Sequence, residues 1–390
     1  MKKISTIVLS ALIAGTLSCA AAAAPHAHSG HPQQKPHHPH APAPIPPHDD
    51  AVLKKLSQET EGVTLEDLRY AYRNAQKKDS IINAMNRPGE AKPWYEYRKI
   101  FIVPKRIADG KNFMKNNRAI FKKAEDRYHV APEIVASIIG VETFYGQQMG
   151  KYRVLDALYT LGFHYPKRAD YFSHEFANFV KLTKQQGWMY SETLGSYAGA
   201  MGMGQFMPWS YLKWAVDFNN DGHKDLFHNN ADAIGSVANY FDSHEWHYGE
   251  PVTVRVYPRD TARVERLLGN GTKPDITVGE LRKLGVSVPH EYDNDLRCKL
   301  FKFEESAGTW SYYAGFHNFY VITRYNKSPL YARAVYELSL EISGKTSDYY
   351  DDDRHHTPHH GGHAPAPKPP VKPAPAPKYP VKPHDGHHRH

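Results

Sequence analysis

Residues 130–146 read VAPEIVASIIGVETFYG, one of the most apolar helical runs in the chain. The run is apolar on nearly every face, which predicts a buried central helix rather than a surface helix. Pro132 fits the first turn of such a helix, and Gly146 can end it. One carboxylate, Glu142, stands near the end, where a charged group is costly unless the protein uses it. The first question about this chain is therefore what surrounds Glu142.

Three effects are expected to raise the pKa of Glu142. The apolar helix removes water from it, the helix C-terminus disfavours a negative charge, and no Lys or Arg follows until Lys151 and Arg153. A carboxyl group that keeps its proton near neutral pH suits a general acid for glycosidic bond cleavage. A hydrogen-bonded structural carboxylate at the helix end is an equally good interpretation of this helix alone.

The next informative segment is GSYAGAMGMGQFMP, residues 195–208. Its glycines let the backbone approach a ligand closely, and Ser196, Tyr197 and Gln205 supply polar groups. The segment is not a phosphate-binding loop, because no Lys follows the glycines and no clear strand precedes them. Close helix packing by small residues is the alternative.

Residues 217–232 read DFNNDGHKDLFHNNAD and begin like an EF-hand loop. Asp217, Asn219 and Asp221 are oxygen donors at loop positions 1, 3 and 5, Gly222 follows, and His223 would offer a backbone carbonyl. The usual last position holds His228 instead of Glu, so a longer loop that ends at Asp232 is needed. These hard oxygen donors predict calcium, with sodium as the alternative; an Asn/Asp-rich turn without metal is the other interpretation. No organic cofactor is expected.

The N-terminus has the organisation of a secretory signal peptide over residues 1–24: Lys2 and Lys3 precede an apolar segment, and small residues follow. The apolar segment is shorter than the ~20 residues of a comfortable membrane span. We therefore expect an exported, periplasmic protein. Cys19 fits a relaxed lipobox and would anchor an outer-membrane lipoprotein, whereas the alanines at 20–24 suit ordinary cleavage; both remain open.

Segments 25–50 and 346–390 are rich in His and Pro. Proline at this density favours disordered, extended spacers, and binding of transition metals by neighbouring imidazoles is the alternative. The formal net charge of +8 would suit an anionic wall polymer but does not identify a fold. Apart from Cys19 the only cysteine is Cys298, so no disulfide is expected there, and its strand-like context favours a packed structural residue.

The remaining chain predicts a mainly α (α+β) protein. Residues 51–250 show mostly helical spacing. PVTVRVYPRD and LRCKLFKFEE, within residues 251–305, alternate like strands. A small β module is therefore predicted at 251–305, followed by a return to Tyr-rich, helical sequence at 306–345.

Six segments together resemble the membrane-bound lytic transglycosylase B family, glycoside hydrolase family 103. They are VETFYGQQMGKYRVLDALYTLGF, KRADYFSHE, GSYAGAMGMGQFMPWSY, VDFNNDGHKDL, DAIGSVANYF and HNFYVITRYN, and they span about residues 65–342 in family order. The resemblance implies a lysozyme-like catalytic core at 116–250 that includes the EF-hand-like loop, a helical domain at 51–115 completed by 306–345, and a small β domain at 251–305. It also implies cleavage of the β-1,4 bond between N-acetylmuramic acid and N-acetylglucosamine in peptidoglycan strands, with a 1,6-anhydro product. No nucleic-acid partner is expected.

The resemblance gives Glu142 both catalytic roles, as acid and then as base. The residues that it places along the sugar cleft are Ser196, Gln205, Phe206, Tyr240, Asn318 and Tyr325. Lys167 and Arg168 occupy a place where the family commonly has two arginines, and Lys167 departs from that pattern because Lys lacks the bidentate fork of Arg. The metal loop is one residue longer than the family's usual form, so its last ligand, Asp232, departs from the family's spacing.

Two other functions are consistent with these residues. A muramidase that hydrolyses the same bond would need a second carboxylate, for which Asp156, Asp170 and Glu192 are candidates. A non-catalytic wall-binding scaffold would make Glu142 structural. The intact pair of Glu142 and the GQFMP segment favours an active enzyme.

Overall fold

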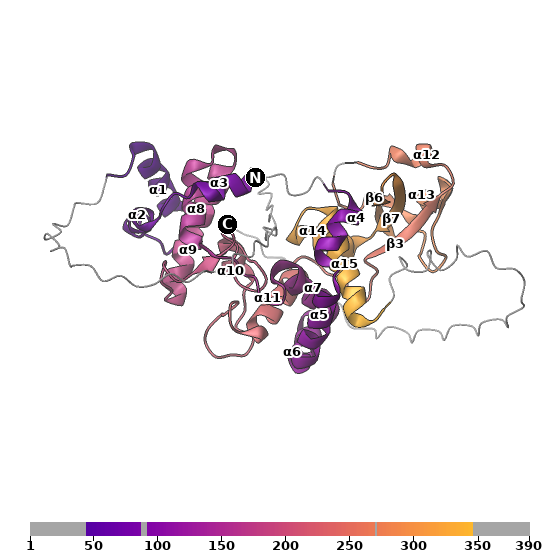
Figure 1. Cartoon of the computed structure of the whole chain (residues 1–390), viewed down its shortest axis with the longest axis horizontal. Helices are drawn as coiled ribbons and strands as arrows, with labels where there is room; N and C mark the ends of the chain where they lie inside the picture. Colours follow the sequence, from indigo (N-terminus) through magenta and orange to yellow (C-terminus); the bar gives the residue numbers. More distant parts are fainter. Residues whose placement is uncertain (1–43, 87–91, 270, 346–390) are drawn as a thin grey trace, which may run out of the picture. The chain divides into compact units, whose positions relative to one another are not determined.

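The computed structural model describes residues 44–86, 92–269 and 271–345, and its helices surround α7 (Pro132–Thr143). All side chains from Ile134 to Thr143 are buried, as the apolar run predicts. Helix α7 contacts α5 (Pro104–Asn116), α6 (Arg118–Tyr128), α11 (Asn230–Asp242) and α15 (Pro329–Ser343) (Figure 1). Helix α7 ends where Phe144, Tyr145 and Gly146 take positive φ angles of 53°, 59° and 84°. This left-handed turn directs the chain away immediately after Glu142.

Two groups of helices can be distinguished by their contacts. In one, α1 and α2 contact α9, α3 contacts α8, and both α8 and α10 contact α9. The bounds in this group are α1 (Pro47–Glu59), α2 (Leu65–Asn74), α3 (Asp79–Met85), α8 (Val154–His164), α9 (Ala169–Gln186) and α10 (Pro208–Trp214). Around α7 and α15 lie α4 (Trp94–Phe101), α5 (Pro104–Asn116), α6 (Arg118–Tyr128), α11 (Asn230–Asp242), α14 (His317–Tyr325) and α15 (Pro329–Ser343).

One antiparallel sheet has the strand order β4-β6-β7-β3-β5. Its strands are β3 (Thr253–Pro258), β4 (Ile276–Thr277), β5 (Val286–Ser287), β6 (Arg297–Ser306) and β7 (Thr309–Gly315), with α12 (Thr261–Glu265) and α13 (Val278–Lys283) between them. Because side chains alternate along a strand, the sheet has two apolar faces. One face forms a separate small core, and the other presents Phe301, Phe303 and Tyr313 to the helical core.

Short elements complete the chain around the centre. Strands β1 (Tyr152–Arg153) and β2 (Leu194–Gly195) pair antiparallel, and the 3-10 helix η1 (Pro166–Arg168) connects α8 to α9. In the described residues no helix combines the length and the apolar character that a membrane crossing requires.

The predicted domain boundaries differ from the structure in two places. The β module continues to Gly315, because β7 pairs with both β3 and β6, whereas the sequence predicted helix from 306 onward. The predicted helical domain at 51–115 is divided: α1–α3 contact α8 and α9, and only α4 and α5 contact α15. Helix α1 also begins at Pro47, before the predicted start at 51.

Two further sequence predictions concern Cys298 and the terminal segments of the chain. Cys298 is fully buried in the small sheet core, and burial raises the pKa of its thiol to about 12, so it is a packed structural residue. The signal peptide, Cys19 and the tail at 346–390 lie outside the described residues, as do residues 25–43 of the N-terminal tail.

A substitution at Gly140, against which Tyr145 packs, tests the packing around α7. A Cβ atom added to Gly140 would lie 2.5 Å from the Tyr145 hydroxyl oxygen and 2.6 Å from its Cζ atom. In an open helix Gly→Ala stabilises by about 1 kcal/mol. Here we expect Gly140→Ala to lower the free energy of unfolding by about 1–3 kcal/mol, because the ring must move. Urea unfolding measures it, with Gly269→Ala, where the new Cβ meets only a lysine Nζ at 3.5 Å, as the near-neutral control.

Candidate active site

Glu142 lies in the last turn of α7 and is only 2% exposed. The Tyr331 hydroxyl of α15 donates a 2.6 Å hydrogen bond to Glu142 Oε1. Burial raises the pKa of Tyr331 well above its usual value, and the nearby charge of Glu142 raises it further. Tyr331 therefore stays a neutral donor, and its hydroxyl orients the carboxyl group of Glu142.

The glycine-rich segment is bound to the end of α7. Thr143 Oγ1 donates to the Met203 carbonyl at 2.8 Å, directly beside Glu142. Met201 and Phe206 pair through two backbone hydrogen bonds of 2.9 Å, which close a tight turn. Gln205 in that turn has φ +51°, a left-handed conformation that is uncommon outside glycine and often occurs at functional sites. The turn thus fixes Gln205 near the end of the Glu142 helix.

Aromatic side chains form a wall behind this turn. The Tyr325 hydroxyl donates to the Gly204 carbonyl at 2.5 Å. Ring centroids are 6.0 Å apart for Phe206 and Tyr240, 6.0 Å for Phe206 and Tyr325, and 4.7 Å for Tyr240 and Tyr325. Burial and the charge of Glu142 both raise the pKa of Tyr325, which places this ring within electrostatic range of the carboxylate. The fold thereby brings four predicted site residues to Glu142 or to its neighbours: Gln205, Phe206, Tyr240 and Tyr325.

Two other predicted cleft residues have structural partners. Ser196 Oγ accepts from the Ala200 amide at 3.0 Å and the Ala198 amide at 3.3 Å, so it shapes the start of the glycine-rich segment. Asn318 is fully buried: its Oδ1 accepts from the His247 amide at 2.9 Å, and its Nδ2 donates to the His247 and Glu250 carbonyls. The prediction that Asn318 lines the cleft is not supported, because both ends of its amide hold the loop after α11.

The basic pair lies on η1. Lys167 is exposed, and the half-buried Arg168 guanidinium stacks over the Tyr171 ring at 4.4 Å and near Phe172 at 4.9 Å. Arg168 is also within electrostatic range of Lys327, in the link between α14 and α15. The positive charge of Arg168 therefore acts on a lysine from a distant segment of the chain.

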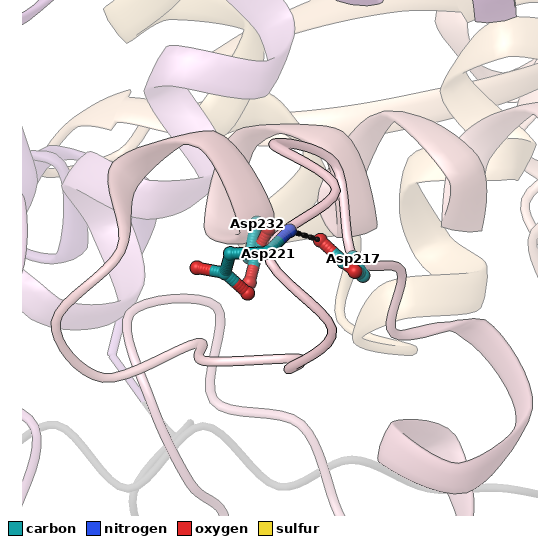
Figure 2. Close-up of side chains that lie close together, drawn as sticks. All are labelled: Asp217, Asp221 and Asp232. Carbon is teal, nitrogen blue, oxygen red and sulfur yellow. Dashed lines mark hydrogen bonds between the residues drawn. The ribbon is translucent and has the colours of Figure 1, made fainter.

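The predicted metal residues converge. Asp217, Asp221 and Asp232 each present a carboxylate oxygen, and these atoms lie within 4.8 Å of one another (Figure 2). The loop is shaped by its own side chains, since Asp217 accepts from the amides of Asp221 at 3.1 Å and Gly222 at 2.8 Å. Asn219 Oδ1 lies beside them and accepts from the Asp221 amide at 3.3 Å.

These donors fit a hard cation. Asp232 is fully buried, and burial raises its pKa, with the charge of Asp217 as a further contribution. Three carboxylates at this spacing repel one another, and a divalent cation would relieve that repulsion. The oxygen-only donor set favours calcium over zinc.

The metal loop also connects to the active-site turn. Asp232 Oδ2 accepts from the Asp225 amide at 2.8 Å, and the next carbonyl, that of Leu226, accepts from the Met203 amide at 2.8 Å. Leu226 therefore holds the backbone that precedes Gln205. The loop that would bind metal supports the geometry of the turn.

The structure gives each of the three candidate second carboxylates its own surroundings. Asp156 accepts from the Gln76 amide at 2.9 Å and pairs with Arg153 at 3.3 Å. Asp170 and Glu192 are exposed.

Sequence reasoning missed Tyr331, Thr143 and Glu175. The only signal for Tyr331 was its place on an apolar helix face, where a buried Tyr hydroxyl needs a partner. Glu175 in α9 is buried, its Oε2 accepts from the Trp209 amide at 2.8 Å, and burial raises its pKa to about 7.

Known proteins are similar to this chain over most of its length. A family model described as the transglycosylase SLT domain matches residues 49–340. Membrane-bound lytic murein transglycosylase B of Escherichia coli K12 is 38% identical over 292 residues, which are 72% of this chain and 79% of that protein.

Solved structures extend the comparison. The soluble lytic transglycosylase SltB1 of Pseudomonas aeruginosa is 42% identical, with TM-score 0.71 over 76% of this chain and 99% of that one. Slt35 of Escherichia coli, solved with calcium, is 38% identical, with TM-score 0.68 over 76% of this chain and 93% of that one. The predicted fold class, mainly α with a small sheet and lysozyme-like, is confirmed by these matches.

Glu175 predicts a pH dependence of stability. Burial raises the pKa of Glu175 from its ordinary value of about 4.5 to about 7, so the folded protein keeps a proton that the unfolded chain releases. This contribution is fully present below pH ~4.5 and is lost as pH rises through ~7. Glu175→Gln should remove about 3 kcal/mol of the change in unfolding free energy across that window. Denaturation at several pH values measures it; the exposed Glu61→Gln is the control, and an unchanged slope in Glu175→Gln would contradict the assignment.

Proposed function

The chain belongs to the transglycosylase SLT domain family, and we propose that in this peptidoglycan lytic transglycosylase Glu142 alone acts as both acid and base. The supporting observation is that Glu142 is buried at the end of α7, with the Tyr331 hydroxyl at 2.6 Å from its carboxyl group. Burial favours the protonated form that the first step requires.

The proposed reaction uses the substrate's own nucleophile. Glu142 donates its proton to the glycosidic oxygen as the bond from C1 of N-acetylmuramic acid to that oxygen breaks. The carboxylate then accepts the proton of the muramic C6 hydroxyl, whose oxygen forms a new bond to C1. The products are a 1,6-anhydro-muramic end and a strand with a free 4-hydroxyl. No water is consumed, and Glu142 ends the cycle protonated.

Neighbouring residues have positioning and binding roles in this proposal. Tyr331 orients the carboxyl group. Gln205, Phe206, Tyr240 and Tyr325 shape the cleft beside it, and Ser196 and Asn318 hold the backbone segments that flank the cleft. Arg168, with Lys167 nearby, would meet the negative charge of the muramic acid or its peptide; only Arg168 can do so with a bidentate fork.

The second candidate function is hydrolysis of the same bond, and a scaffold without turnover is the third. Purified peptidoglycan should be digested with the mature full-length chain and the soluble muropeptides weighed. We expect 1,6-anhydro ends. Reducing ends, heavier by one water, would favour a muramidase with a second carboxylate. Wall binding without soluble products would favour the scaffold.

We also infer a structural calcium site. Asp217, Asn219, Asp221 and Asp232 would supply side-chain oxygens and His223 a backbone carbonyl, with sodium as a weaker alternative. The calcium complex of Slt35 supports this assignment. When bound, the ion would neutralise the three carboxylates.

The location is proposed from the N-terminal sequence. Residues 1–24 would direct export to the periplasm, where peptidoglycan lies, and Cys19 would add an outer-membrane lipid anchor if it is the processed N-terminus. The relative in Escherichia coli is named as membrane-bound. Mass spectrometry of the mature N-terminus distinguishes the two processing sites.

The His-rich tails remain candidates for transition-metal binding. A chain without the tails should then take up less metal than the full-length chain.

Changing the acid tests the mechanism. Glu142→Gln keeps the size of the side chain and a hydrogen-bonding oxygen, but it can neither donate nor accept the catalytic proton. We expect kcat to fall by about 10³-fold or more, with the melting temperature and wall binding retained. Release of muropeptides from peptidoglycan measures it. Turnover near the wild-type rate would overturn the proposed role of Glu142.

Tyr331→Phe is the matched control for orientation. It removes one hydroxyl and leaves Glu142 in place, so kcat should fall by about 10-fold, with KM little changed. An effect as large as that of Glu142→Gln would show that Tyr331 takes part in the chemistry itself.

Calcium should stabilise the folded chain, because it would bind the three converging carboxylates only when they are assembled. We expect the melting temperature to rise by a few degrees in calcium and to fall back with a chelator. Asp221→Ala should remove this gain, whereas Asp260→Ala, at the cap of α12, should retain it. If calcium leaves the melting temperature of the wild-type chain unchanged, the result would count against the site.

A further inference from the structure

A cavity lies where the β module meets α14 and the start of α15. Its volume is about 480 Å³. One wall is Gly269, Gly271 and Thr272 of the β module, and the opposite wall includes Tyr320, Thr323 and Arg324 of α14, followed by Lys327 and Pro329. The two walls are joined by a 2.7 Å hydrogen bond between the hydroxyls of Thr272 and Thr323. The catalytic assignments above do not use this cavity.

The lining of this cavity is positively charged. Among the described residues that line it, Arg324 and Lys327 are cationic and none is acidic. Asp275, which follows the Thr272 wall in sequence, is itself paired with Lys299 at 2.6 Å. Pro329 is the first residue of the 15-residue helix α15, so the positive end of that helix dipole adds to the same potential. The cavity therefore combines two cations with a helix N-terminus, which suits an anion.

The cavity adjoins the active-site residues. Arg324 precedes Tyr325, whose hydroxyl holds Gly204 beside Gln205, and the Arg324 carbonyl accepts from the Tyr240 hydroxyl at 2.7 Å. Burial lowers the pKa of Lys327, and the charges of Arg324 and Arg168 lower it further. Lys327 thus lies within electrostatic range of Arg168 on η1, which connects the cavity to the basic side of the cleft.

We propose that this cavity binds a carboxylate of the peptide that substrate strands carry, with Lys327 and Arg324 as its cationic ligands. The inference rests on the proposed function, because it takes peptidoglycan as the substrate. In peptidoglycan the peptide is attached to the muramic acid, so a strand placed with its muramic acid at Glu142 directs the peptide out of the cleft. A volume of about 480 Å³ accommodates a peptide end rather than a single small ion. The β module then has a role in substrate selection.

The test compares two substrates with the mature full-length chain. One is glycan strands with intact peptides, and the other is the same strands after an amidase has removed the peptides. The readout is the ratio of kcat/KM for the first substrate to kcat/KM for the second. We expect Lys327→Met and Arg324→Met each to lower this ratio by about 5- to 20-fold, because each removes a charge-assisted hydrogen bond while keeping an unbranched apolar stem. Lys327→Arg keeps the charge and should keep most of the ratio.

Several outcomes would overturn the proposal. A purely structural role would lower both rates and leave the ratio unchanged, and a wild-type ratio near one would show that the peptide is not recognised. Inorganic phosphate is the second arm: if millimolar phosphate inhibits both substrates equally and Lys327→Met abolishes that inhibition, the cavity is a phosphate site instead. Because the ratio is measured on active enzyme, a failure of the Glu142 assignment leaves this test interpretable.

Discussion

The carboxyl group of Glu142 is buried at the end of an apolar helix, and much of the surrounding structure can be understood as what keeps it there. Removing a carboxyl group from water without a partner is costly. The partner seen here is the Tyr331 hydroxyl, which comes from a helix 189 residues later in the chain. Helix α15 must therefore return across α7, and the contacts of α4, α5 and α14 with α15 follow from that return. The proposed acid is assembled from both ends of the folded region.

A second consequence is that the glycine-rich turn depends on supports from three directions. Thr143 holds the Met203 carbonyl from the helix end, Tyr325 holds the Gly204 carbonyl from α14, and Leu226 holds the Met203 amide from the metal loop. Gln205 can keep its uncommon left-handed conformation because the surrounding backbone is held in this way. Since Asp232 binds the Asp225 amide, next to Leu226, order in the metal loop is coupled to order in the turn.

The sheet contributes through both of its faces. One face encloses its own small core, while Phe301, Phe303 and Tyr313 on the other pack into the helical core. The buried Arg333 of α15 stacks on Phe303 and Tyr313 at 4.8 and 4.4 Å, so the β module is bound to the helix that carries Tyr331. Phe301 of the same sheet also lines the basic cavity beside α14. A module that looks peripheral in the sequence is thus adjacent to residues that shape the cleft.

Local patterns in the sequence determined the apolar helix with Glu142, the mainly helical class, and the Asp217, Asn219 and Asp221 spacing, because each depends on residues only a few positions apart. The resemblance of six segments to a known family predicted the activity, which the comparisons confirm, and a set of sugar-cleft residues, which stays a prediction. The tertiary structure alone revealed Tyr331 as the partner of Glu142, the loop-holding role of Asn318, the strand at 309–315 and the division of the helical segment at 51–115. Each of these depends on contacts between distant segments, and periodicity does not specify which buried face meets which. The hydroxyl of Tyr331 needed a partner, but only the packed fold placed it against Glu142.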